Sequence, residues 1–219
     1  MTDITNRLET QASRSLQYLL LKMQLNRLTQ QLQFIIEIDK LKNVLRQTLL
    51  IDASRRENSG EHSWHLAMMT MILAEYATEG TDLFRAMKMS LIHDLVEIDA
   101  GDTFCYDVQG YENKAERELE AATRIFGLLP EEQAKELRLL WDEFEARVTP
   151  TAKFAAALDR IQPFLHNQQT EGGTWKIHNI NRSQVMKRMA PVEEGTPELW
   201  DFILAEIEDC ITKEYLKSS

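Results

Sequence analysis

The sequence predicts an all-α protein built from long helices. Its 219 residues are enough for one domain with a substantial core. Only eight glycines and five prolines occur in the whole chain, so we expect few turns and long elements. Apolar residues near the N-terminus recur with helical spacing, and no internal repeat or low-complexity linker divides the chain.

The first helix is expected over about residues 12–37. Its apolar residues are spaced 3, 4, 3, 4 and 3 apart, and they are Tyr18, Leu21, Leu25, Leu28, Leu32 and Ile35. Such a heptad-like seam fits either packing against the chain's own domain or a contact between two subunits. Because the seam is longer than a small domain usually needs to cover itself, we predict a homodimer that uses part of this helix.

The next elements lead into the centre of the chain. Asp39 suits the N-cap of a second helix reaching about Leu49, and a polar connection over residues 51–60 follows it. Further helices are expected over about residues 61–78 and 83–98, followed by a glycine-containing loop over 101–111.

The C-terminal half continues the helical pattern. Pro130 and Pro150 lie beside expected helix starts, where proline is tolerated, whereas Pro163 is expected to end or kink its helix. A long loop is expected over residues 168–181, around two consecutive glycines. The expected helices cover about residues 112–126, 131–147, 151–167, 183–189 and 197–215.

Charge and cysteine content exclude some classes of protein. The net charge of −10 repels polyanions, so a nucleic-acid polymer is not an expected partner, although a local cationic cluster could still receive a small phosphorylated substrate. Cys105 and Cys210 lack metal-type spacing and are expected to be reduced thiols. We find no signal peptide and no run of about 20 apolar residues, so a cytoplasmic protein without a membrane span is expected.

Two histidines and two aspartates form a candidate metal site. His62 precedes the adjacent pair His93-Asp94, and Asp159 closes an apolar run further along. Two imidazoles and two carboxylates suit one divalent ion that polarises an oxygen or activates a water. Manganese, cobalt, iron, nickel, zinc and magnesium all accept such ligands. Glu97 lies one helical turn after His93 and would share its face without being required as a ligand.

These residues resemble the HD-domain metal-dependent phosphohydrolase superfamily, within the branch that contains bacterial 5′-deoxynucleotidases. The matching stretches are residues 55–63, residues 93–97 with Gly101-Asp102, and Leu158-Asp159. The resemblance covers about residues 32–215 and implies an HD-domain helical bundle. We therefore divide the chain into an N-terminal helical extension, residues 1–31, and an HD domain, residues 32–219.

The resemblance also implies roles for individual residues. It assigns the metal to His62, His93, Asp94 and Asp159, and it assigns catalytic proton transfer, at the attacking water or the leaving oxygen, to Glu97 and Asp102. Arg46 is the nearest match to an arginine that family members use on monophosphates. Gln47 stands where the characterised bacterial deoxynucleotidase has tryptophan, so the sugar preference stays open. No histidine lies between Asp94 and Asp159, where two-metal relatives usually carry two, and this favours one metal.

Several other polar residues are candidates for weaker roles. Arg55 is a candidate for substrate binding, or it pairs with Glu57 or Glu61. Lys114 and Arg117 either bind phosphate or form a solvated face. His65 is expected to pack beside the metal site rather than bind the ion, and His166 and His178 are expected to make ordinary contacts.

Two functions fit this sequence. The first is a metal-dependent phosphomonoesterase that acts on nucleoside 5′-monophosphates or a similar small phosphomonoester. The alternative is a non-catalytic or regulatory HD protein that binds a metal and a nucleotide. Glu97 and Asp102 favour the enzyme, because a degenerate member should have lost one of them.

Overall fold

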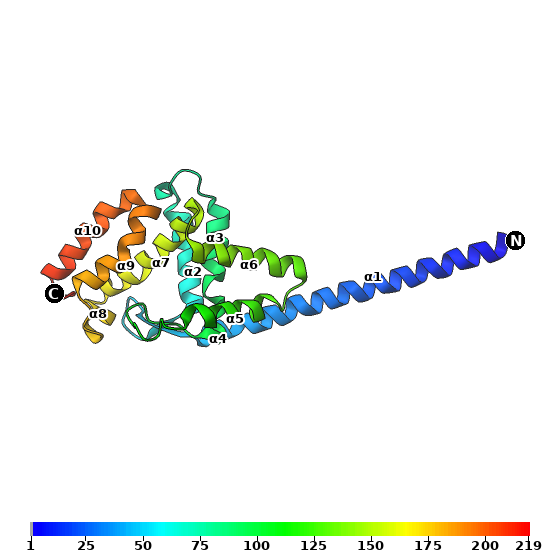
Figure 1. Cartoon of the computed structure of the whole chain (residues 1–219), viewed down its shortest axis with the longest axis horizontal. Helices are drawn as coiled ribbons and strands as arrows, with labels where there is room; N and C mark the ends of the chain where they lie inside the picture. The colour runs from blue at the N-terminus through cyan, green and yellow to red at the C-terminus, as the bar shows by residue number, and fades with distance from the viewer. Residues whose placement is uncertain (1) are drawn as a thin grey trace.

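The protein is a helical body from which one long helix projects. A computed structural model describes the backbone of residues 2–219 and the side chains of residues 20–219. The predicted all-α class is confirmed, and the described residues contain only one small two-stranded sheet. The projecting helix is α1 (Thr2–Ile38), which begins earlier than the predicted residue 12 (Figure 1).

The C-terminal end of α1 packs on the body through Phe34 and Ile38, polar side chains add further contacts, and the apolar seam stays exposed. Gln31 donates to Gln133 of the body at 2.8 Å, and Arg27 pairs with Glu132. Leu25 and Leu32 of the seam are 56% and 49% exposed, and Leu21, Leu28 and Ile35 are exposed to a similar degree. The side chain of Tyr18 lies outside the described residues. Within the described part of the chain, neither α1 nor any other helix is long and apolar enough to cross a membrane.

The predicted second helix, over residues 39–49, is wrong. A short 3₁₀ turn, η1 (Asp39–Asn43), leads instead into β1 (Leu45–Leu49), which pairs antiparallel with β2 (Arg56–Asn58). Arg46 and Thr48 are buried on one face of β1 while their neighbours are more exposed, which is the alternation of a strand. Backbone pairing with β2 and burial of this face outweigh the local helical pattern.

Both central helices occur near their predicted positions, but both are interrupted: the one predicted over residues 61–78 ends at Ile72. α2 (Ser59–Ile72) begins at a capping box, and a 3₁₀ turn, η2 (Ala74–Tyr76), follows it. The expected helix over residues 83–98 is divided into α3 (Leu83–Ile92), η3 (His93–Val96) and α4 (Glu97–Ala100). The tighter winding of η3 falls on the His93-Asp94 pair.

Three predictions for the C-terminal half need correction. Pro163 does not end its helix, which continues through Gln169. The expected loop over residues 168–181 contains a short helix, and the expected short helix over 183–189 is twice as long. The elements here are α5 (Lys114–Phe126), α6 (Glu131–Ala146), α7 (Pro150–Gln169), α8 (Gly173–Ile177), α9 (Arg182–Gly195) and α10 (Pro197–Thr212).

α7 is the central helix of the body. Residues 154–158 are fully buried, and α2, α3, α6 and α9 pack around them. The approach of α9 requires glycine at its end, because a Cβ on Gly195 would lie 2.2 Å from the Lys153 carbonyl oxygen. A helix held from several sides positions its polar residues rigidly, and Asp159 directly follows the buried run.

Candidate metal centre

The four predicted metal ligands meet inside the body, although they come from three separate elements. His62 lies on α2, His93 and Asp94 on η3, and Asp159 on α7, and all four are buried. Asp159 Oδ1 lies 3.0 Å from His62 Nε2 and 3.7 Å from His93 Nε2. Asp94 Oδ1 lies 3.0 Å from His93 Nε2, and Asp94 Oδ2 lies 3.9 Å from His62 Nε2.

Each imidazole uses its other nitrogen to fix its orientation. His93 Nδ1 donates to the Ser90 carbonyl oxygen at 3.0 Å, and His62 Nδ1 is 3.0 Å from Gln162 Oε1. Both Nε2 atoms therefore face the two carboxylates. Buried His93 Nε2 has no partner of hydrogen-bonding geometry among the described residues. Orienting the second nitrogen in this way is typical of histidines that bind metals.

The electrostatics of the centre favour a cation. Burial opposes charge on His93, but Asp94 and Asp159 outweigh it and raise the pKa of His93 to about 10. Burial and the charge of Arg46 instead lower the pKa of His62 to about 4. Burial opposes charge on Asp159, but His93 and the Arg160 guanidinium beside its carboxylate hold its pKa well below the ordinary value. The carboxylates therefore attract positive charge to His93 Nε2, and a divalent ion supplies such charge.

Arg46 is the predicted substrate residue that reaches this centre. From β1 its Nη1 donates to Asp94 Oδ2 at 2.8 Å and lies 3.8 Å from Asp102 Oδ1. Arg55 does not reach it, because this exposed side chain pairs with Glu61 at 2.5 Å on the protein surface. Of the two interpretations of Arg55, the structure favours the ion pair.

Glu97 and Asp102 line the same cavity as His93, Asp94 and Asp159. Glu97 accepts a hydrogen bond from Ser59 Oγ at 2.6 Å, and burial together with the charge of Asp94 raises its pKa well above 4.5. Burial also raises the pKa of Asp102, although Arg46 offsets part of this effect. Two carboxyl groups with raised pKa values beside a metal site are suited to general acid–base chemistry.

The cavity holds about 420 Å³ and has a cationic and an aromatic wall. Asp159 Oδ2 accepts from Arg160 Nη1 at 2.8 Å and lies 3.5 Å from Arg188 Nη2. The aromatic side chains on the wall include Phe104, Tyr106 and Trp175. This volume is within the range of small-molecule sites.

The sequence did not point to Arg160 or Arg188, which line the cavity. The position of Arg160, directly after Asp159, was a usable signal. No local pattern marks Arg188, because only the packing of α9 on α7 brings it to the cavity.

Of the other candidates, Lys114 lies at the cavity, whereas Arg117 and His178 make structural contacts. Lys114 lines the cavity and pairs with Glu118 at 2.5 Å. Arg117 holds the loop over residues 101–111, since it donates to the carbonyl oxygens of Ala100 and Gly110. His178 stacks on Phe104 with ring centroids 4.5 Å apart.

The chain is similar in sequence to known proteins. A family model described as HD domain matches residues 38–200. Human 5′-deoxynucleotidase HDDC2 is 33% identical over 141 residues, which are 64% of this chain and 68% of the human protein. The Bos taurus protein of the same name is 31% identical over 141 residues, covering 64% of this chain and 67% of its own length.

Two solved structures resemble the fold of this chain. A crystal structure from Magnetospirillum magnetotacticum MS-1, described as a predicted metal-dependent phosphohydrolase, is 53% identical with a TM-score of 0.85, covering 88% of this chain and 96% of its own. A conserved hypothetical protein from Pyrococcus furiosus shares the fold at 23% identity and a TM-score of 0.57, covering 83% of this chain and 99% of its own. The chain is a member of the HD domain family.

Proposed function

We propose that this protein is a metal-dependent phosphomonoesterase that releases phosphate from nucleoside 5′-monophosphates. Family membership and relatives named 5′-deoxynucleotidase support a nucleotide phosphohydrolase. The observation that carries the proposal is the convergence of two imidazole Nε2 atoms and two carboxylates beside a cavity with buried acid–base groups.

The residues present suit one divalent metal ion. His62, His93 and Asp159 offer ligand atoms that all lie within 4.8 Å of one another, and Asp94 adds a second carboxylate. We propose these four as the ligands, with the identity of the metal left open. When bound, such an ion polarises a phosphoryl oxygen and lowers the pKa of a water.

The surrounding side chains account for binding of a phosphate dianion. Burial opposes charge on Arg46, but Asp94 and Asp102 raise its pKa, so its guanidinium stays charged in the cavity. Arg188 lines the same cavity and supplies a second guanidinium. Planar guanidinium groups bind phosphate oxygens in pairs and stabilise charge that develops during transfer.

Glu97 and Asp102 supply proton transfer. Water adds its oxygen to phosphorus as the ester P–O bond breaks, so one proton leaves the water and one joins the nucleoside oxygen. We assign the first transfer to Glu97, which Ser59 orients, and the second to Asp102. Their raised pKa values bring both groups closer to neutral pH, where general acid–base catalysis is most efficient.

The aromatic wall supports a nucleoside as the leaving group. The aromatic side chains of Phe104, Tyr106 and Trp175 line the cavity. A nucleobase can stack on aromatic rings of this kind. Gln47 also lines the cavity. We therefore propose that the base is bound mainly by stacking, with the preference between ribose and deoxyribose left to measurement.

The exposed seam of α1 supports a homodimer. Its leucines are about half exposed, so packing within the chain does not cover them. We propose that a second copy of the chain covers part of this helix. The division into an N-terminal helical extension, residues 1–31, and an HD domain, residues 32–219, stays a prediction. Cytoplasmic location stays a prediction, consistent with the two free thiols of Cys105 and Cys210.

A metal-by-substrate screen tests the proposed activity. Metal-stripped protein is incubated with each divalent metal and with a panel of ribo- and deoxyribonucleoside 5′-monophosphates, and inorganic phosphate is measured. We expect release only with metal, and loss of release in Asp94→Asn. Nucleotide binding without phosphate release under any metal would favour the regulatory alternative.

A further inference from the structure

Gln162 connects the metal centre to a second group of polar residues. It lies on α7, three residues after Asp159, and its side chain is fully buried. Its Oε1 is 3.0 Å from His62 Nδ1. Its Nε2 is 2.6 Å from Glu57 Oε1 and 3.0 Å from His166 Nε2.

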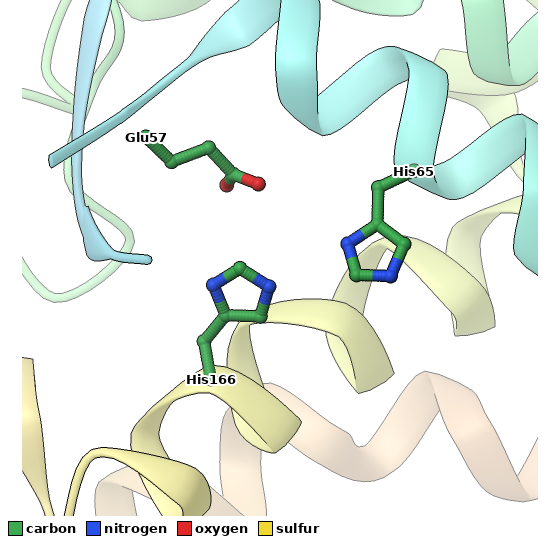
Figure 2. A group of neighbouring side chains, drawn as sticks. All are labelled: Glu57, His65 and His166. Carbon is green, nitrogen blue, oxygen red and sulfur yellow. The ribbon is translucent and has the colours of Figure 1, made fainter. Parts of the chain in front are cut away.

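The second group fixes which end of the Gln162 amide faces His62. Glu57, His65 and His166 point toward one shared space (Figure 2), and Gln162 Nε2 lies among their polar atoms. His166 Nε2 must accept because Nδ1 donates to the Leu49 carbonyl oxygen at 2.8 Å, and the Glu57 carboxylate, when ionised, also accepts only. The atom between them must therefore be the NH₂ group, which leaves the amide oxygen facing His62.

This orientation determines the tautomer of His62. An amide oxygen only accepts, so His62 Nδ1 carries the hydrogen and Nε2 presents its lone pair. That lone pair lies 3.0 Å from Asp159 Oδ1, which is also an acceptor. Two bare acceptors at this distance repel unless a cation lies between them, so the tautomer suits metal binding.

We propose that Gln162 is a positioning residue that holds His62 in its metal-binding tautomer, anchored by Glu57 and His166. The proposal rests on the proposed metal-dependent function and deepens it. The second group of polar residues has the composition of another metal site, since Glu57, His65 and His166 offer ligand atoms within 4.8 Å of one another. The Gln162 NH₂ group, which cannot ligate a cation, already lies among them, so we expect one metal ion per chain.

Zinc binding to full-length variants tests the proposal without an activity readout. Gln162→Met keeps the length of the side chain but removes both polar ends, and we expect its zinc affinity by calorimetry to fall about 10–100-fold, the usual range for partners of metal-binding histidines. His65→Ala is the matched control. His65 belongs to the same group of polar residues, but it is partly exposed and its Nδ1 lies 3.4 Å from Gln162 Nε2, which is long for a hydrogen bond. We therefore expect the zinc affinity of His65→Ala to stay within about 2-fold of wild type.

Nitrogen-15 spectra of the zinc-loaded wild-type protein provide a measurement that needs no variant. We expect the hydrogen of His62 on Nδ1 and zinc on Nε2. Hydrogen on Nε2 would overturn the proposal, as would unchanged zinc affinity in folded Gln162→Met. Binding of two zinc ions per chain, with one lost in His166→Ala, would overturn it in favour of a second metal site. A wild-type protein that binds zinc in this way but releases no phosphate with any divalent metal would instead refute the proposed function alone.

Discussion

Replacing Arg46 with alanine should both destabilise the protein and impair phosphate release. Arg46 is 8% exposed and its guanidinium is the cation nearest to Asp94, with Asp102 and Glu57 also within 4 Å. Removing it leaves buried carboxylates without their charge partner.

The size of the effect follows from this burial. Breaking a buried ion pair by deleting one partner costs about 3–5 kcal/mol. For a protein of this size, about 1 kcal/mol shifts Tm by about 2–4 °C, so Arg46→Ala should lower the Tm of the metal-free protein by about 6–20 °C. A bound divalent ion supplies positive charge among the same carboxylates, so added metal should raise the Tm of this variant more than that of wild type.

Arg55→Ala is the matched control for Arg46→Ala. Arg55 lies just before β2 and makes an ion pair with Glu61 whose two side chains are 52% and 36% exposed. Exposed pairs contribute about 0–1 kcal/mol, so this variant should melt within a few degrees of wild type.

Thermal melts with and without metal, and phosphate release, compare the two variants. Arg46→Ala should lose about 10²–10³-fold in kcat, the usual cost of removing one donor to a developing charge. Equal melting of the two alanine variants, together with phosphate release within a few-fold of wild type for both, would refute the role of Arg46.

Three further predictions concern other parts of the molecule. Glu97→Gln should abolish most turnover while metal content by atomic absorption stays at the wild-type level; loss of the metal would make Glu97 a ligand instead. Burial raises the pKa of Glu57 to about 7 against an ordinary 4.5, so the folded state binds its proton more tightly and loses stability as pH rises through this interval. Denaturant titrations should therefore show wild type losing about 3 kcal/mol relative to Glu57→Gln between pH 4.5 and 7.5, and parallel curves would exclude the raised pKa. Deleting residues 1–31 should convert a dimer into a monomer in light scattering and leave metal binding intact; a monomeric wild type, or a truncated protein that stays dimeric, would contradict the role of the seam.

Much of the candidate site could be predicted from the sequence because its residues lie in short, ordered motifs. His93, Asp94 and Glu97 are adjacent or one turn apart, so their proximity is local. The place of His62 and Asp159 beside them depended on the family resemblance. The break of this segment into α3, η3 and α4 was not predicted, since a 3₁₀ turn keeps the same apolar spacing over a few residues.

The remaining features depend on tertiary packing. Arg46 was placed on a helix, but β2, ten residues further on, recruits its segment into a hairpin. Arg188 and Gln162 contact partners 29 and 100 residues away, and no local sequence pattern indicates such contacts. Pro163 was expected to end or kink α7; it does not end the helix, which neighbouring elements bury on most sides and which continues through Gln169.

A titration of metal-stripped protein with manganese, cobalt or zinc tests the central claim most directly. Phosphate release from a nucleoside 5′-monophosphate is followed as metal is added in fractions of an equivalent per chain, alongside the Asp159→Asn variant. We predict that activity is absent without metal, rises linearly and saturates at one equivalent, while the variant stays inactive with weakened metal binding. Full phosphate release by the stripped protein, or by Asp159→Asn, would contradict the account.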